Sequence, residues 1–305
     1  MRTELTFFGT GTSQGVPIIG CRCPVCTSQD SRDKRFRSSA FVRYGGISIL
    51  IDAGPDFRSQ MLRFGISHLD AILLTHNHKD HTGGLDDVRS LNYIDRHAAE
   101  IWCEPMVLET LKTEYGYAFT EKKYPGAPEW HVHLIDENEF SIVPDKEEKV
   151  LEWVHDVGYR YRLPDGSLTG CGPIVDRAVN TPEGVRIIPI RGWHGMMPVL
   201  GFRFGNIAYI TDMSAIPEDE FSKLEDLEHL TLNTVSYKPH HSHFSLDEAL
   251  EIADRVGAKN TWLTHLSHTF PSHPEFSRML SSLCRERHIR SSVQPAYDGL
   301  TIVSD

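Results

Sequence analysis

One short run constrains this chain more than any other feature: Thr-His-Asn-His-Lys-Asp-His-Thr-Gly-Gly at residues 75–84. It places four metal-binding side chains within six residues, His76, His78, Asp80 and His81. The run follows the apolar stretch 71–74, which predicts a short buried strand. The first two histidines are two residues apart on the extended chain, so they face the same way and can bind one ion. The aspartate and the third histidine point elsewhere, toward a second ion.

A pair of metal ions requires more ligands than this run supplies. Two divalent cations about 3.5 to 4 Å apart repel each other by roughly 19 kcal/mol at an effective dielectric constant of about 20. Neutral imidazoles cannot offset that repulsion, so the site needs anionic ligands and favours a bridging hydroxide. Ends of strands in a rigid sheet can present ligands to a common cleft. Three candidates each follow an apolar stretch: His194, Asp212 and His265.

With these positions in place, the sequence resembles the metallo-beta-lactamase superfamily, whose signature is His-x-His-x-Asp-His. The resemblance implies a first ion bound by His76, His78 and His194, a second bound by Asp80, His81 and His265, and a bridging carboxylate, Asp212. It counts Asp80 among the catalytic residues as well as the ligands. It also implies an α+β fold, a four-layer αββα sandwich of two mixed sheets flanked by helices, with the metals in the cleft at its edge.

A second motif lies in the N-terminal loop, residues 9–30, where Cys21, Cys23 and Cys26 have the spacing C-x-C-x2-C. Three thiolates this close suit a closed, tetrahedral structural zinc. A disulfide is a weaker interpretation, because cysteines at this spacing pair poorly and no secretory signal is visible. His268, three residues after His265, is the candidate fourth ligand. Buried cysteines without a metal are the remaining alternative.

Three features point to one family within this superfamily. They are the glycine-rich start of the N-terminal loop, its three cysteines, and the run Thr-His-Leu-Ser-His at 264–268. Together they are similar to the phosphoribosyl cyclic phosphate phosphodiesterases of the carbon-phosphorus lyase pathway and their relatives. That family implies a structural Zn²⁺ on the cysteines and His268, and two divalent ions, Zn²⁺ or Mn²⁺, in the active site. It also implies attack on a small cyclic phosphodiester by a metal-bridging hydroxide, and a catalytic role for His243.

His243 lies just before a predicted helix. Ser245 and Glu248 form a capping-box pattern, and apolar residues at helical spacing predict a helix over 246–256 that ends at Gly257. The positive end of the helix favours an anionic ligand nearby. A protonated His243 could stabilise charge on a transferring phosphoryl group or protonate the leaving oxygen. An ordinary loop histidine is the alternative.

The remaining pattern predicts a single domain over residues 1–305. Strands are predicted at 4–8, 40–44, 47–51, 184–189, 199–204 and 207–210, and helices at 56–64, 106–115, 246–256 and 275–287. Residues 117–181 are rich in charge, proline and aromatic side chains and are interpreted as an insertion before His194. An insertion there could cover the cleft and change substrate choice.

The net charge and hydropathy of the chain indicate which binding partners and which location in the cell to expect. The net charge of −11 gives no support for nonspecific binding to nucleic acid, and a basic run at 32–37 is either solvated or steers substrate. The chain lacks an 18-residue apolar run, so a soluble, cytoplasmic protein without a membrane partner is expected. A small phosphodiester is the expected partner; nucleic acid and a homodimer are left open. The alternatives are an RNA-processing nuclease, a hydrolase of another ester or lactam, and a noncatalytic metal-binding protein, which the complete ligand set disfavours.

Overall fold

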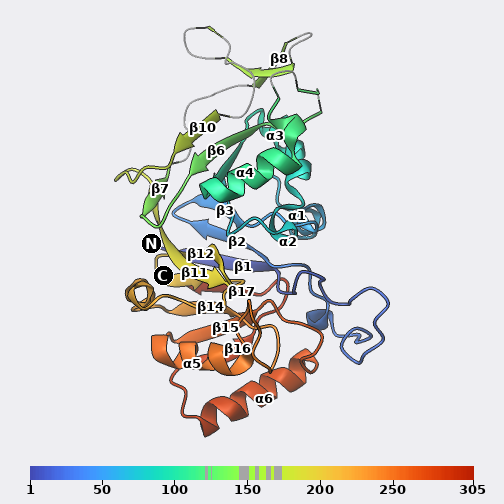
Figure 1. Cartoon of the computed structure of the whole chain (residues 1–305), viewed down its shortest axis with the longest axis vertical. Helices are drawn as coiled ribbons and strands as arrows, with labels where there is room; N and C mark the ends of the chain where they lie inside the picture. The colour runs from blue at the N-terminus through green and yellow to red at the C-terminus, as the bar shows by residue number, and fades with distance from the viewer. Residues whose placement is uncertain (121–122, 125, 144–150, 155–157, 163–165, 168–173) are drawn as a thin grey trace.

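A computed structural model of the chain shows two β-sheets packed face to face, with helices on both outer sides (Figure 1). This arrangement confirms the expected α+β sandwich of four layers. The structure describes the chain except for residues 121–122, 125, 144–150, 155–157, 163–165 and 168–173. Within the described residues, every helix is too short or too polar to span a lipid bilayer.

The first sheet has eight strands in the order β10-β6-β5-β4-β3-β2-β1-β17. Its strands are β1 (Thr3–Gly9), β2 (Ser39–Tyr44), β3 (Ile47–Ile51), β4 (Ala71–Leu73), β5 (Ala99–Cys103), β6 (Trp130–Leu134), β10 (Ile174–Arg177) and β17 (Thr301–Ser304). Strands β3, β4, β5, β6 and β10 run parallel to one another. Both faces of this sheet are covered, because Ile49 packs into the core between the sheets while Leu50 packs under the outer helices.

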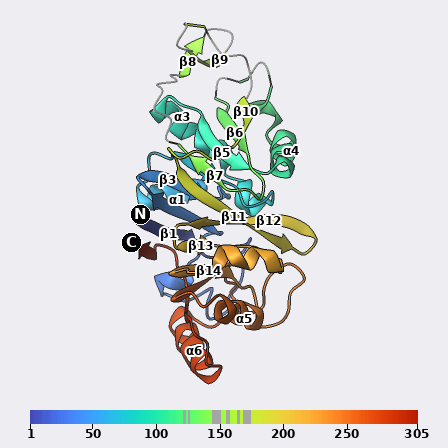
Figure 2. The same ribbon diagram turned by 90° about the vertical axis from the view of Figure 1, so that its left-hand side faces the viewer.

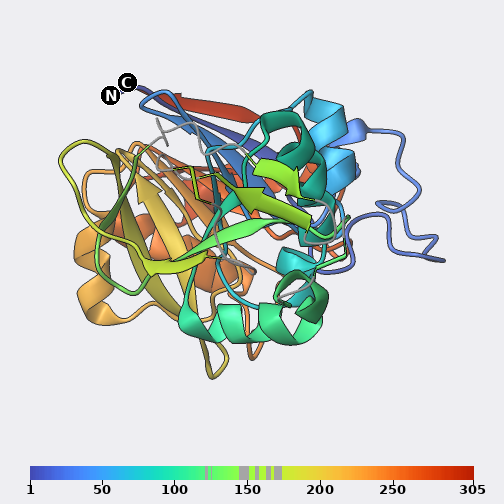
Figure 3. The ribbon, with the colours of Figure 1, turned by 90° about the horizontal axis from the view of Figure 1, so that it is seen from above.

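The second sheet has seven strands in the order β16-β15-β14-β13-β12-β11-β7. Its strands are β7 (Phe140–Ile142), β11 (Val185–His194), β12 (Met197–Phe204), β13 (Ile207–Tyr209), β14 (His229–Asn233), β15 (Asn260–Thr264) and β16 (Ser292–Pro295). Two further strands, β8 (Leu151–Val154) and β9 (Gly158–Tyr161), pair with each other and, within the described residues, with no other strand. The ends of the chain lie side by side, since β1 pairs antiparallel with β17 (Figures 2 and 3).

Helices cover each sheet on the side away from its partner. The first sheet is covered by α1 (Phe57–Phe64), α3 (Arg89–Asp95) and α4 (Pro105–Glu114), and the second by α5 (Leu246–Val256) and α6 (His273–Glu286). The short elements are α2 (Lys79–Thr82), η1 (Ser31–Asp33), η2 (Leu85–Val88), η3 (Gly116–Ala118) and η4 (Glu218–Leu224). Each sheet therefore buries one face against the other sheet and one against helices.

Several predicted elements are confirmed in position. Helix α5 has the predicted bounds, and its capping box forms: Ser245 N–H donates to Glu248 Oε2 at 2.7 Å, and Glu248 N–H donates to Ser245 Oγ at 3.4 Å. The strand predicted at 184–189 was too short. It continues to His194 because β11 pairs with β12 as far as the pair His194 and Met197.

The segment 117–181 contributes to both sheets within its described residues. Strands β6 and β10 join the edge of the first sheet, and β7 pairs with β11 in the second. The interpretation of this segment as an insertion, and of the chain as one domain, stays a prediction.

Candidate metal centres

The main candidate site lies where strands of the two sheets end. Strand β4 of the first sheet is followed by His76, and His78 is the residue before helix α2, which carries Asp80 and His81. In the second sheet, β11 ends with His194. Asp212 follows β13 and His265 follows β15 in the same way. The two sheets therefore deliver these side chains to a shared edge.

Two overlapping groups of donor atoms form there, and Asp212 belongs to both. Donor atoms of His76, His81 and Asp212 lie within 4.8 Å of one another, and those of His194, Asp212 and His243 form a second group by the same measure. Nε2 of His81 is 3.4 Å from Asp212 Oδ2 and 3.3 Å from Asp80 Oδ2. This position of Asp212 is the one that a bridging carboxylate requires.

The remaining predicted ligands lie against these groups. The ring of His78 is centred 4.7 Å from that of His76 and 4.9 Å from that of His194. Nδ1 of His265 is 3.0 Å from Asp212 Oδ1. The structure thus brings all seven histidines and aspartates predicted from strand ends and from the signature run into one centre, here called the main centre.

The main centre has the properties expected of a metal site. Nε2 of His76, Nε2 of His81 and Nδ1 of His243 are buried without a hydrogen-bond partner. A buried polar nitrogen left unpaired is costly, so these atoms are placed for a cation or a bound substrate. The other nitrogens of His76 and His81 are occupied: Nδ1 of His76 lies 2.9 Å from Thr75 Oγ1, and Nδ1 of His81 lies 2.6 Å from Asp52.

Asp52, which the sequence did not single out, contacts one of the predicted ligands. It is fully buried and accepts hydrogen bonds from Thr75 N–H at 2.9 Å, from Thr75 Oγ1 at 2.9 Å, and from His81 Nδ1–H at 2.6 Å. A carboxylate behind a ligating histidine fixes the tautomer and orientation of its ring. The available signal was the position of Asp52 directly after the apolar strand β3, as with Asp212 after β13.

Glycine permits a close approach beside this carboxylate. A Cβ on Gly54 would lie 1.9 Å from the carbonyl oxygen of Asp80, and a Cβ on Gly84 would lie 2.1 Å from the carbonyl oxygen of Gly54. Any larger residue at Gly54 would displace the backbone of helix α2. The glycine therefore fixes the position of Asp80 and His81 relative to Asp52.

The charges of the main centre are strongly coupled. Burial alone would raise the pKa of Asp212, but the adjacent His265 and His81 outweigh it and hold this pKa well below its usual range. Burial, together with His265, lowers the pKa of His243 to about 3. His243 is therefore neutral in this arrangement, unlike the protonated form considered from the sequence. Its ring is centred 4.7 Å from those of His194 and His265.

A second centre forms in the N-terminal loop from Cys21, Cys23, Cys26 and His268, whose donor atoms all lie within 4.8 Å of one another. Nδ1 of His268 is 3.3 Å from the sulfur of Cys21 and 3.5 Å from those of Cys23 and Cys26. Tetrahedral zinc with ordinary bond lengths would separate sulfur and nitrogen by roughly 3.6 Å. The four side chains therefore fit one zinc ion.

The basic run at 32–37 anchors this loop. Arg35 is buried, and its guanidinium donates to Thr10 Oγ1 at 2.8 Å and to the carbonyl of Ala296 at 2.6 Å. Arg37 pairs with Asp56 at 3.1 Å. The prediction of a solvated run is wrong for Arg35, because its charge is used inside the fold. Since only two residues lie between His265 and His268, the two centres share one segment of chain.

Comparison with known proteins shows the family of the chain. Residues 48–266 match the family model described as a beta-lactamase superfamily domain. A solved structure described as a new diphosphatase from the PhnP family is 34% identical in sequence, covers 100% of this chain and 98% of its own, and superposes with a TM-score of 0.76.

Two curated relatives carry different names. The octanoyltransferase of Porphyromonas gingivalis is 35% identical over 299 residues, which covers 97% of this chain and 51% of that protein. The chain thus spans about half the length of this relative. The ribonuclease Z of Streptomyces coelicolor is 25% identical over 266 residues, which covers 82% of this chain and 87% of that protein.

Proposed function

The chain belongs to the beta-lactamase superfamily, and we propose that it is a metal-dependent hydrolase whose substrate is a small cyclic phosphodiester on a ribose or nucleotide. The observation that carries this proposal is the presence of two centres on one segment, the main centre at His265 and the cysteine centre at His268. That combination is what the resemblance to the cyclic phosphate phosphodiesterases implies. The full-length similarity to a PhnP-family diphosphatase supports the same phosphoryl chemistry.

We assign the ligands of the main centre to two divalent ions, Zn²⁺ or Mn²⁺. The first would be held by His76, His78 and His194, the second by Asp80, His81 and His265, and both by Asp212. Imidazole and carboxylate ligands suit either metal. When bound, such a pair supplies a water of lowered pKa as the nucleophile and neutralises charge on the phosphoryl oxygens. The cysteine centre would hold a structural Zn²⁺.

The chain's own residues prepare this chemistry. Asp52 accepts a hydrogen bond from His81 Nδ1–H, which leaves Nε2 of that ring to bind an ion. The carboxylates of Asp80 and Asp212 balance the positive charge of the ions. His194 is oriented in the same way, because its Nδ1 donates to the carbonyl oxygen of Asp212 at 2.9 Å.

His243 is assigned to the leaving oxygen. It lies immediately before the capped N-terminus of α5, where the helix dipole favours negative charge. As a neutral imidazole, it carries one N–H, which can donate a hydrogen bond to the departing oxygen and stabilise the negative charge that develops there. Metal coordination by His243 is the competing role, because it lies in a donor group with His194 and Asp212.

A second candidate substrate is a diphosphate, in which a phosphoanhydride replaces the cyclic ester. The specific observation in its favour is the 34% identical diphosphatase that matches the whole chain. The two reactions differ in the leaving group: cyclic ester hydrolysis opens a ring and gives one product, whereas diphosphate hydrolysis separates two.

The test is a substrate panel with the purified, metal-loaded chain. It compares a ribose cyclic phosphate, a 2′,3′-cyclic nucleotide, a dinucleoside diphosphate, a precursor transfer RNA, an octanoyl thioester and a beta-lactam. The proposal expects the highest kcat/KM for a cyclic phosphodiester, followed by the diphosphate. Preferential cleavage of the RNA, the thioester or the lactam would overturn it. These three substrates are included because the names of the relatives or of the superfamily suggest them.

A further inference from the structure

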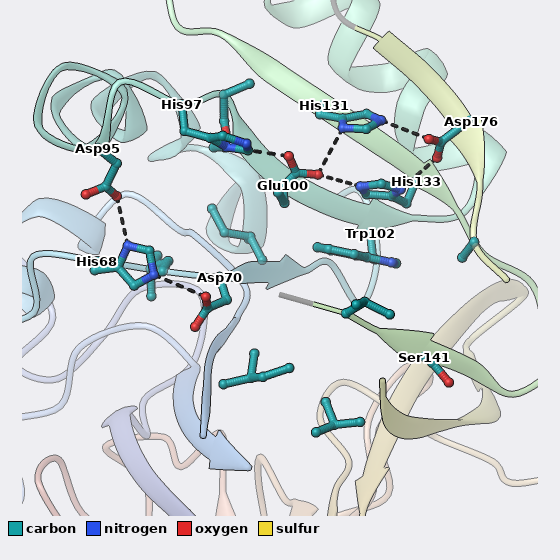
Figure 4. A pocket seen from close by; sticks show the side chains of 18 of the residues that line it. His68, Asp70, Asp95, His97, Glu100, Trp102, His131, His133, Ser141 and Asp176 are labelled. Carbon is teal, nitrogen blue, oxygen red and sulfur yellow. Dashed lines mark hydrogen bonds and ion pairs between the residues drawn. The ribbon is translucent and has the colours of Figure 1, made fainter. Parts of the chain in front are cut away.

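A third group of metal-binding side chains lies away from both centres, in a cavity of about 1330 Å³ (Figure 4). Glu100 on β5, His131 and His133 on β6, and Asp176 on β10 line it. Strand pairing brings them together, because Glu100 is opposite His131 and His133 is opposite Asp176. Alternate residues of a strand share a face, so all four side chains project from the same side of the sheet.

The two imidazoles lie between the two carboxylates. Glu100 Oε2 is 3.0 Å from His131 Nδ1 and 2.6 Å from His133 Nε2. On the other side, Asp176 is 2.9 Å from His131 Nε2 and 2.6 Å from His133 Nδ1. Every ring nitrogen of the pair therefore faces a carboxylate oxygen, as the dashed lines of Figure 4 show.

Two neutral imidazole rings carry too few N–H protons to form all four of these hydrogen bonds. Ionised carboxylates only accept hydrogen bonds, and a neutral imidazole has one N–H to donate. Two neutral rings supply two donors, so two of the four contacts lack a proton. Protonating both rings would supply four donors, but it would place two positive charges on imidazoles whose centres are 4.2 Å apart, and the two carboxylates would have to offset that repulsion. A cation on one side of the rings removes the conflict.

We propose that Glu100, His131 and His133 form a binding site for a divalent transition-metal ion, Zn²⁺ in the first instance. Donor atoms of these three residues lie within 4.8 Å of one another. Two imidazoles and a carboxylate are a ligand set that Zn²⁺ accepts, with a fourth position left for water. The side chains of Glu100, His131 and His133 are largely buried, which shields the site from competing water.

Asp176 completes the arrangement without binding the ion. With the ion on the Glu100 side, each neutral ring keeps one N–H, at His131 Nε2 and His133 Nδ1, and both donate to Asp176. All four contacts are then satisfied by two protons and one cation. A carboxylate that receives the second N–H of metal-bound histidines fixes their tautomers and raises their basicity. The ring of Trp102, stacked 4.2 Å from that of His133, holds the latter in place.

This site is separate from the main centre. Strand β4 separates the two sites. His76 of the main centre lies beyond the C-terminal end of β4, whereas His68 and Asp70, which line the cavity, lie before its N-terminal end. The lining of the cavity therefore includes the end of β4 that lies away from the main centre. An ion there would link β5, β6 and, through Asp176, the edge strand β10.

The experiment measures zinc per chain in the whole protein after chelator treatment and reloading with Zn²⁺. His133→Ala and His131→Ala should each contain one zinc fewer than the wild type. The matched control is His68→Ala, since His68 lines the same cavity but contacts Asp70 and Asp95 rather than the cluster; its zinc content should equal that of the wild type. Equal zinc content in the wild type and both cluster variants overturns the proposal.

Two further measurements keep the test decisive if a histidine variant does not fold. Asp176→Asn changes a half-exposed side chain and should retain the ion with a Kd raised about 10- to 100-fold. Zinc-edge anomalous diffraction from the wild type should show a peak about 2.0 to 2.2 Å from the donor atoms of Glu100, His131 and His133. Crystals that show zinc at the other two centres but none here would mean that the cluster holds protons only, which contradicts the proposal.

Discussion

Replacing Asp52 with asparagine should weaken metal binding at the main centre although Asp52 binds no ion itself. The asparagine oxygen can still accept from Thr75, but its NH₂ group then faces His81 Nδ1–H, so two donors oppose each other where a 2.6 Å hydrogen bond now lies. Losing a hydrogen bond to a buried charged group costs about 1.5 to 3 kcal/mol. Loss of an outer carboxylate typically weakens metal binding about 10- to 100-fold, or roughly 1.4 to 2.7 kcal/mol. The two ranges agree.

The assay is competition for Zn²⁺ between the stripped protein and a chromophoric chelator. Asp70→Asn is the matched control, because Asp70 accepts a backbone hydrogen bond from Ser48 at 2.7 Å in the same sheet but precedes β4, at the end away from the main centre. Its zinc affinity at the main centre should stay within about twofold of the wild type. An unchanged affinity in Asp52→Asn, or an equal loss in the control, would refute the reasoning.

Four other changes test separate parts of the account. Asp212→Ala should lose at least one ion per chain by elemental analysis and all measurable hydrolysis, and retained metal with full activity would contradict its bridging position. His243→Ala should lower kcat about 10²- to 10³-fold with metal content unchanged, because one hydrogen-bond donor to the leaving oxygen is lost; loss of an ion would make His243 a ligand instead. Cys23→Ser should lose one zinc and lower Tm by roughly 4 °C or more, whereas Cys284→Ser, outside the cluster, should keep the zinc. Gly54→Ala should destabilise the fold by about 1 to 3 kcal/mol in denaturant titration, because its Cβ would lie 1.9 Å from the Asp80 carbonyl; Gly116→Ala, with open space around it, is the control.

The proximity of the main-centre residues could be predicted from the sequence, because each lies at a strand end or in one dense run. His194, Asp212 and His265 each follow an apolar stretch, and β-sheet geometry brings such ends together. The capping box of Ser245 and Glu248 was equally local, since it depends on a spacing of three residues.

The residues that were missed depend on contacts between distant strands. Asp52 follows a strand like many structural aspartates, and only the 2.6 Å contact with His81 reveals its role. Glu100 lies about 30 residues before His131 and His133, and a parallel strand pairing sets them opposite one another. No local pattern fixes that register. The burial of Arg35 was missed for the same reason, because its partners Thr10 and Ala296 come from opposite ends of the chain.

Zinc-edge anomalous diffraction from crystals of the metal-loaded protein tests the central claim most directly. The account predicts two peaks about 3.5 to 4 Å apart, both within bonding distance of Asp212, with His76, His78 and His194 around one and Asp80, His81 and His265 around the other. A single peak, or two peaks that do not share Asp212, would contradict it.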